Sequence, residues 1–192
     1  MRHVWHFNQG NEEIRGEVPF ADGTCLRLAH EWVTRNMAGR PFDPGILNAT
    51  RIRRDQLAYL VSGDKLLKNT RLSDDTVWDS LTQLSAFALG NWGGGTFEYD
   101  RGLQTFGDLF ARQGAASAIL CVYGKDQSGG RWGHAMASLR GDTLFDPNTG
   151  EWELDGSPSA RAQDLKIYCE GGDILIFPGD TLEALRFILC AA

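Results

Sequence analysis

The spacing of apolar residues changes once along this chain, near Gly114, from a helical period to short extended runs. Over residues 25–38 the apolar positions follow the helical period, and a glycine and a proline then supply a stop signal. The same criteria predict further helices over residues 51–61, 73–89 and 106–113. The first part of the chain is therefore predicted to be helical.

After Gly114 the chain consists of short apolar runs separated by Gly and Asp, a pattern typical of antiparallel strands. The predicted strands are residues 117–123, 132–139, 143–146, 152–154 and 174–177. The closing segment TLEALRFILC fits a helix or a strand equally well. Helices that precede strands, rather than alternate with them, predict an α+β fold and not a doubly wound α/β sheet.

The length of the chain favours one domain. With 192 residues and 42% hydrophobic content, the chain can bury one substantial core. No repeat, low-complexity linker or composition break marks a boundary. We therefore predict a single domain over residues 1–192, in which a helical part at about 20–114 packs on an antiparallel β-sheet at about 115–192.

The charge balance and the N-terminus exclude several classes of protein. A formal net charge of −6 does not provide the broad basic face that binds nucleic acid. The one dense basic run, residues 51–54, is predicted to be a solvated helix face. No signal peptide is present at the N-terminus, and the longest apolar stretch, residues 115–123, is too short to span a bilayer. We expect the protein to be cytoplasmic in the cell that produces it. Delivery into a target cell by a secretion system is the alternative that stays open.

Only one of the four cysteines has an unusual setting. The four are Cys25, Cys121, Cys169 and Cys190, which lie far apart without a CxxC pair or clustered histidines. We therefore predict no metal site and no cofactor. Cys121 and Cys190 stand in apolar runs, where a thiol behaves as a small buried hydrophobe. Cys25 instead stands in GTCLRLAHEW, at the predicted start of a helix.

A cysteine at a helix start suits nucleophilic chemistry. The unpaired N–H groups and the positive dipole end of the first turn stabilise a thiolate, and the N–H of Cys25 would face an oxyanion. Thr24 and Asp22 are the candidate caps of this helix. The alternative is a buried cysteine that begins an amphipathic helix. A nucleophilic cysteine also needs a base and a group that orients the base.

Four histidines are available as the base. His3 and His6 lie in a segment without a partner pattern, and the His30 side chain points away from the start of its own helix. His134 differs because it lies in GRWGHAMASLRGDTLFDPNTGEW, where its predicted strand is followed by a tight turn and a second strand. His134 is therefore the candidate base.

The hairpin that contains His134 also carries a candidate acid, Asp146. A hairpin centred on Arg140 would place these two residues directly opposite each other on neighbouring strands. A two-residue turn at Gly141 and Asp142 would shift the register and separate them. The alternative is a half-buried strand histidine followed by an ordinary Asp-Pro-Asn turn.

The segments GTCLRLAHEW, GHAM and LFDPNTGEW, in this order, resemble the catalytic signatures of the YopT and AvrPphB family of papain-like cysteine proteases, bacterial effectors that cleave host proteins. The resemblance spans residues 23–152 and rests on about thirty of them. It implies a papain-like fold, a protein substrate and a triad in which Cys25 is the nucleophile, His134 the general base and Asp146 the group that orients the imidazole.

Two features depart from the family pattern. Family members carry a polar side chain shortly before the cysteine to complete the oxyanion hole, whereas Phe20 stands five residues before Cys25. Gln9 and Asn8 are the alternative donors. The long N-terminal leader of type III effectors is also missing, which leaves the delivery route open.

Three functions are compatible with these residues. The first is a cysteine protease that acts as an effector or toxin. The second is another Cys-His-Asp acyl-transfer enzyme, either a transglutaminase-type glutamine deamidase or a cell-wall peptide amidase, since the chemistry up to the thioester is the same. The third is a non-catalytic binding module on the same fold. Selective alkylation of Cys25 would separate the two enzymes from the binding module.

Overall fold

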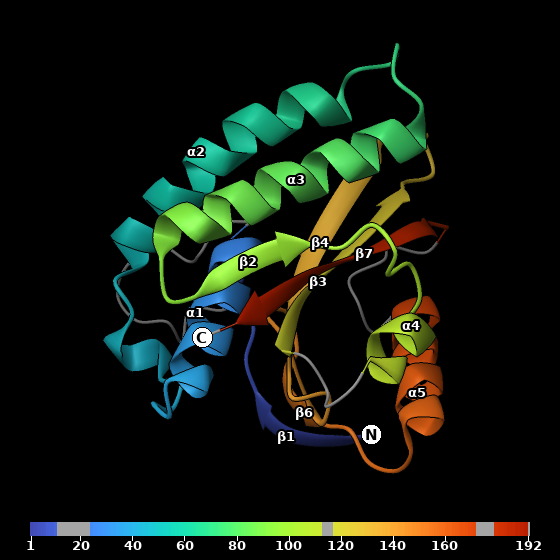
Figure 1. Ribbon diagram of the computed structural model, residues 1–192. Helices are drawn as coiled ribbons and strands as arrows, with labels where there is room; N and C mark the ends of the chain where they lie inside the picture. Colours follow the sequence, from blue (N-terminus) through green and yellow to red (C-terminus); the bar gives the residue numbers. More distant parts are fainter. Residues whose placement is uncertain (11–23, 113–116, 172–178, 192) are drawn as a thin grey trace.

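The computed structural model describes residues 1–10, 24–112, 117–171 and 179–191. Within these residues an antiparallel sheet forms the middle layer, and helices pack on both of its faces (Figure 1). This is the α+β architecture that the order of helical and extended patterns predicts.

The α-helices are α1 (Cys25–Met37), α2 (Ala49–Leu67), α3 (Asp74–Trp92), α4 (Phe106–Ala111) and α5 (Pro158–Glu170), with a 3-10 turn, η1, at Pro44–Ile46. The strands are β1 (Arg2–His6), β2 (Thr96–Tyr99), β3 (Ser117–Lys125), β4 (Arg131–Leu139), β5 (Thr143–Asp146), β6 (Gly150–Glu153) and β7 (Thr181–Ala191). In the sheet they lie in the order β1-β6-β5-β4-β3-β7-β2, and all neighbours are antiparallel.

Side-chain caps set the beginnings of the two long helices. Asn48 and Ser73 each accept a hydrogen bond from a first-turn N–H group, at the start of α2 and α3 respectively. α2 continues to Leu67, beyond its predicted end at residue 61. The helix passes through Gly63, which is buried so close to α3 that an added Cβ would meet Leu81 at 3.4 Å. Packing between the two helices therefore offsets the low helix propensity of glycine.

β3 separates two hydrophobic cores because it is buried on both faces. Ile119, Cys121 and Tyr123 face the core shared with α1, α2 and α3. Leu120 and Val122 face the core shared with α4 and α5. The alternation follows the period of two in a strand. The sheet is thus covered on both sides, with the larger helices on one side (Figure 1).

Pairing with distant strands determines the secondary structure of segments for which the local pattern is ambiguous. The closing segment TLEALRFILC is the strand β7, because it pairs with β3 on one side and with β2 on the other. β1 and β2 carry no local pattern that predicts them, and they form the edges of the sheet. α5 is not among the predicted helices, although Ser157 and Pro158 form a helix start signal. The strand predicted over residues 174–177 lies outside the described residues.

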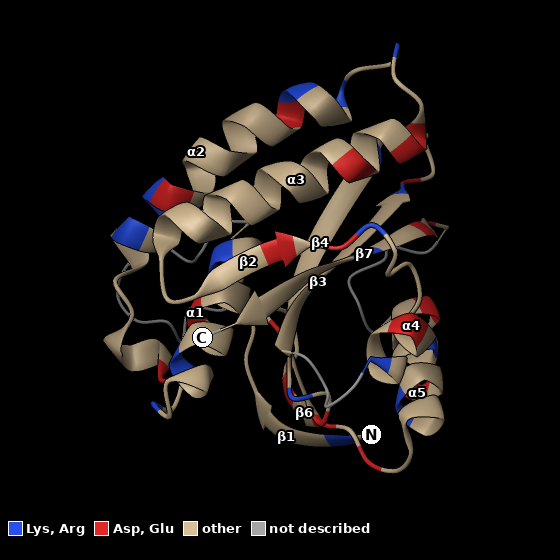
Figure 2. Cartoon of the chain, viewed as in Figure 1, with Lys and Arg blue, Asp and Glu red and all other residues tan. Residues whose placement is uncertain are grey.

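The charged side chains of α3 are all acidic, whereas both signs lie close together at the beginning of α2 (Figure 2). There Arg51 and Arg54 are exposed and both pair with Asp55, as the prediction of a solvated helix face requires. In the part of the chain that the structure describes, no helix combines the length and apolar character needed to cross a membrane.

Candidate active site

Cys25 is the first residue of α1, as predicted, and lies where this helix packs against β4. The residue is 8% exposed. Thr24 occupies the cap position, but its hydroxyl makes no capping bond and instead donates to Gln9 Oε1 at 3.0 Å. The expectation that Thr24 caps the helix is therefore wrong, and the other candidate, Asp22, lies outside the described residues.

The β4–β5 hairpin brings His134 and Asp146 together, but in a different register from the predicted one. The observed pairs begin with Leu139 and Thr143, so the hairpin is centred one residue beyond Arg140. Asp146 is thereby displaced by two residues from the position opposite His134. A displacement of two keeps both side chains on one face of the sheet. His134 Nε2 donates to Asp146 Oδ1 across 2.8 Å, as a diagonal neighbour.

The loop between the two strands has three residues, Arg140 to Asp142, and it begins with a tight turn. Its two central residues are Arg140 and Gly141, with φ of 51° and 68°, and the N–H of Asp142 bonds the carbonyl of Leu139 at 3.2 Å. Positive φ at both positions is the condition of the tight turn that matches the twist of a hairpin. Neither the predicted hairpin centred on Arg140 nor the alternative two-residue turn at Gly141 and Asp142 is the one formed.

Hydrogen bonds hold the Asp146 carboxylate in place on both of its oxygens. Oδ1 accepts from the N–H of Asn148 at 2.8 Å as well as from His134. Oδ2 accepts from the hydroxyl of Tyr168 at 2.9 Å. Asp146 is fully buried. Tyr168 lies on α5, and no feature of the sequence links it to the site.

The thiol of Cys25 and the imidazole of His134 form a hydrogen-bonded pair. Because Nε2 of the ring bonds Asp146, Nδ1 is the nitrogen that remains for the sulfur. Burial raises the pKa of the Cys25 thiol, but His134 and the N–H groups of Ala135 and Leu26 lower it further, to a net value below the ordinary one. Burial lowers the pKa of His134, but Asp146 and Cys25 raise it above its ordinary value. The pair therefore favours thiolate and imidazolium.

The two candidate oxyanion donors of the N-terminal segment differ in their hydrogen bonds, since the amide nitrogen of Gln9 donates to another residue and the bond of Asn8 uses its oxygen. Gln9 is buried, donates from Nε2 to Asn148 Oδ1 at 2.6 Å and accepts from Thr24. It thus bridges the residue before the nucleophile and the loop after β5. Asn8 Oδ1 accepts a hydrogen bond from the local backbone at 2.8 Å. Phe20 lies outside the described residues.

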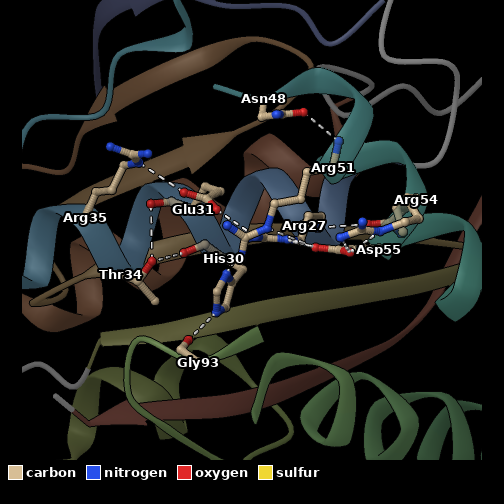
Figure 3. A network of polar contacts seen from close by, with 11 residues as sticks. Arg27, His30, Glu31, Thr34, Arg35, Asn48, Arg51, Arg54, Asp55 and Gly93 are labelled. Atoms are coloured by element: carbon tan, nitrogen blue, oxygen red, sulfur yellow. Dashed lines mark hydrogen bonds and ion pairs between the residues drawn. The ribbon is translucent and has the colours of Figure 1, made fainter. Parts of the chain in front are cut away.

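A buried polar network ties the first turns of α1 to α2 (Figure 3). Arg27 is fully buried and forms ion pairs with Glu31 at 2.7 Å and with Asp55 of α2 at 3.3 Å. Arg27 Nη1 donates to His30 Nδ1 at 2.8 Å, and His30 Nε2 donates to the carbonyl of Gly93 at 2.7 Å. The network fixes the orientation of the helix that carries the cysteine.

His30 is occupied by this network and is not placed to act on Cys25. Burial, and then the charge of Arg27, lower the pKa of His30 to about 4. The ring is therefore neutral at neutral pH, with one nitrogen donating and the other accepting.

A pocket of about 430 Å³ opens beside Cys25 and His134. Its walls are the inner faces of α2 and α3 and the strands β3 and β4, and they are mainly apolar. Within the described residues no group of three or more His, Cys, Asp or Glu side chains is placed to hold a metal ion.

No family model and no curated protein matches this sequence. The solved structure of the Pseudomonas avirulence protein AvrPphB is similar over 99% of this chain and 97% of that one, with a TM-score of 0.57 and 18% sequence identity. The protein has a papain-like fold. In the papain-like fold the start of α1 lies against the strand that carries His134, which accounts for the meeting of residues more than a hundred positions apart.

Proposed function

We propose that this protein is a cysteine protease in which Cys25 attacks the substrate, His134 transfers protons and Asp146 orients the imidazole. The observation that carries the proposal is the linked arrangement of thiol, imidazole and carboxylate, with 2.8 Å between His134 Nε2 and Asp146 Oδ1. The papain-like fold supports it. A lowered thiol pKa supports it further, because the thiolate is the nucleophile.

The proposed reaction proceeds through a thioester. The Cys25 thiolate bonds to the carbonyl carbon of a peptide bond, and the carbonyl oxygen takes the negative charge beside the N–H of Cys25. His134 gives its proton to the nitrogen of the leaving amine as the C–N bond breaks. Water then loses a proton to His134 and attacks the thioester, and the thiolate leaves as the acid product forms. Asp146 stays ionised and stabilises the imidazolium.

We further propose that the substrate is a protein of another cell, so that the enzyme acts as an effector or toxin. The similar solved structure is that of an avirulence protein from Pseudomonas. The signature segments around Cys25, His134 and Asp146 resemble those of effector proteases in the same order.

Mapping of new protein N-termini tests the proposal. Purified wild type and Cys25→Ala are incubated with bacterial and eukaryotic lysates, and new N-termini are identified by mass spectrometry. We expect a set of cleavages that only the wild type produces. Conversion of glutamine to glutamate by the wild type, without new N-termini, would instead assign the deamidase chemistry. If the wild type and the variant leave the lysates identical, the protease and the deamidase hypotheses are both contradicted, and the non-catalytic binding module is the remaining function.

A further inference from the structure

The signature segment LFDPNTGEW contains two polar side chains that the proposed triad does not use, Thr149 and Trp152. The indole N–H of Trp152 donates to Thr149 Oγ1 at 2.9 Å. The same oxygen of Thr149 lies 2.5 Å from the hydroxyl oxygen of Tyr168, which in turn donates to Asp146 Oδ2 at 2.9 Å. A continuous row of hydrogen bonds therefore runs from Trp152 to the acid of the proposed triad.

The chemistry of the groups fixes the direction of each bond in this row. An indole nitrogen only donates, so Thr149 Oγ1 accepts from Trp152. An ionised carboxylate only accepts, so the single proton of the Tyr168 hydroxyl is directed to Asp146. The proton between the two hydroxyls must then come from Thr149. Each hydroxyl thus donates one bond and accepts another, and every proton of the row points toward Asp146.

The side chains of the row are held in place by packing and by the backbone. Tyr168 is buried on α5, and its ring packs edge to face on the indole of Trp152, with 5.5 Å between the ring centroids. The backbone N–H of Thr149 bonds the carbonyl of Asp146 at 3.1 Å, so the turn after β5 holds the middle of the row beside its end. α5 thereby contacts the proposed triad through one tyrosine hydroxyl.

A row of hydrogen bonds with one direction strengthens its last member. A hydroxyl that accepts a hydrogen bond becomes a better donor, because its own O–H bond is further polarised. The bond from Thr149 therefore strengthens the bond from Tyr168 to the fully buried carboxylate of Asp146. A carboxylate held in this way keeps Oδ1 aimed at His134. The imidazolium is then more stable, and Cys25 loses its proton at a lower pH.

We propose that Tyr168, Thr149 and Trp152 are positioning residues of the active site. They act through Asp146 on the proton that the thiol and the imidazole of the triad share. The proposal rests on the proposed function, since it names the residues that hold the acid of the proposed triad. None of the three needs to contact the substrate, because their effect is on the stability of the imidazolium and hence on the pH at which the thiolate forms.

The pH dependence of Cys25 alkylation by iodoacetamide, followed by peptide mapping, tests the last bond of the row without a known substrate. Tyr168→Phe removes only the hydroxyl. We expect alkylation at neutral pH to slow by about three- to tenfold and the pH profile to move to higher pH, since one hydrogen bond to a charged group is lost. A lower unfolding free energy of Tyr168→Phe with an unchanged pH profile would show a structural role only and overturn the proposal.

A second tyrosine supplies the matched control. Tyr99 also donates its hydroxyl to an aspartate, Asp79, at 2.7 Å, but it lies on the edge strand β2. Tyr99→Phe therefore removes the same kind of hydrogen bond away from the proposed triad. We expect it to leave the rate and the pH profile of Cys25 alkylation unchanged. If Tyr99→Phe moves the profile as far as Tyr168→Phe does, the effect does not pass through Asp146 and the proposal is wrong.

The earlier members of the row are tested in order. Thr149→Val keeps the shape of the side chain but removes its hydroxyl, and we expect it to move the profile in the same direction by up to about twofold in rate, because Tyr168 still reaches Asp146. Thr149→Ser keeps the hydroxyl and should restore the profile lost in Thr149→Val. Trp152→Phe keeps a ring against Tyr168 and should have the smallest effect. Effects that do not decrease from Tyr168 to Trp152 would assign the change to packing and overturn the row.

The two proposals fail in different ways, because alkylation of Cys25 requires no substrate. If Tyr168→Phe moves the pH profile as expected but no new N-termini appear in lysates, the positioning residues stand and the protease fails. If the wild type produces cleavages that Cys25→Ala does not, but Tyr168→Phe and Thr149→Val keep the wild-type pH profile, the protease stands and the positioning residues fail.

Discussion

His134 Nε2 donates to Asp146 Oδ1 across 2.8 Å, although the two residues occupy diagonal and not opposite positions on β4 and β5. The second carboxylate oxygen accepts a hydrogen bond from the hydroxyl of Tyr168 on α5. The carboxylate therefore cannot rotate away from the ring without losing a buried hydrogen bond. Since the bond to Asp146 occupies Nε2, it directs Nδ1 toward Cys25.

Replacement of Asp146 tests the role of its charge. Asp146→Asn keeps the shape of the side chain but stabilises the neighbouring imidazolium less, so we expect turnover to fall on the order of tenfold, and further for Asp146→Ala. In both variants the apparent pKa of Cys25 should rise, because the imidazolium that lowers it is less stable. The measurement is the pH dependence of Cys25 alkylation. An unchanged profile together with unchanged turnover would make Asp146 a turn residue only.

The wild type should show a bell-shaped dependence of kcat/KM on pH. The Cys25 pKa lies below its ordinary 9.0 and the His134 pKa above its ordinary 6.5, so the ion pair is populated between the two folded-state values. We expect the rate to rise as Cys25 loses its proton and to fall at higher pH as His134 loses its own. A single rising limb that follows the ordinary thiol pKa would contradict the ion pair.

Cys25 should be the first of the four cysteines to react. Burial raises the pKa of Cys121 and Cys190 to about 12 and that of Cys169 further, whereas the Cys25 pKa is lowered. At neutral pH iodoacetamide should therefore modify Cys25 selectively, as peptide mapping would show. We also expect Cys25→Ala and Cys25→Ser to lose turnover with little change in thermal stability. Equal labelling of all four cysteines would argue for a binding module.

His30 and His134 should respond differently to replacement. His134→Ala removes the base and should lose turnover about as completely as loss of the thiol. His30→Ala removes two buried hydrogen bonds, so we expect it to cost about 1–3 kcal/mol of unfolding free energy while the folded protein keeps its turnover. Urea titrations give the unfolding free energy, and turnover rates corrected for the folded fraction give the activity of the folded protein. Retained turnover in His134→Ala would move the base to another residue.

Removal of Arg27 should destabilise the fold, because it leaves the carboxylates of Glu31 and Asp55 without their buried partner. We expect Arg27→Met to lower the unfolding free energy by about 2–4 kcal/mol. The control is Arg54→Met, since Arg54 also pairs with Asp55 but is exposed, and it should change stability by less than about 1 kcal/mol. Equal effects in urea titrations would mean that the network in Figure 3 does not support α1.

The sequence alone determined those parts of the fold that depend on neighbouring residues. The start of α1 at Cys25 and the bounds of the strand at residues 143–146 follow from local periodicity. The common face of His134 and Asp146 follows in the same way, because side-chain direction alternates with a period of two. An error of two residues in register therefore did not separate them.

Only the tertiary structure decided the contacts made between distant segments. The three-residue loop from Arg140 to Asp142 sets the register of the hairpin, and arginine at its first position gives no local signal for the positive φ that it adopts. The cap that Gln56 provides for Arg27 and the bond from Tyr168 to Asp146 join residues 29 and 22 positions apart on different elements. Such contacts exist only once helices and sheet have packed, so no periodicity in the sequence encodes them.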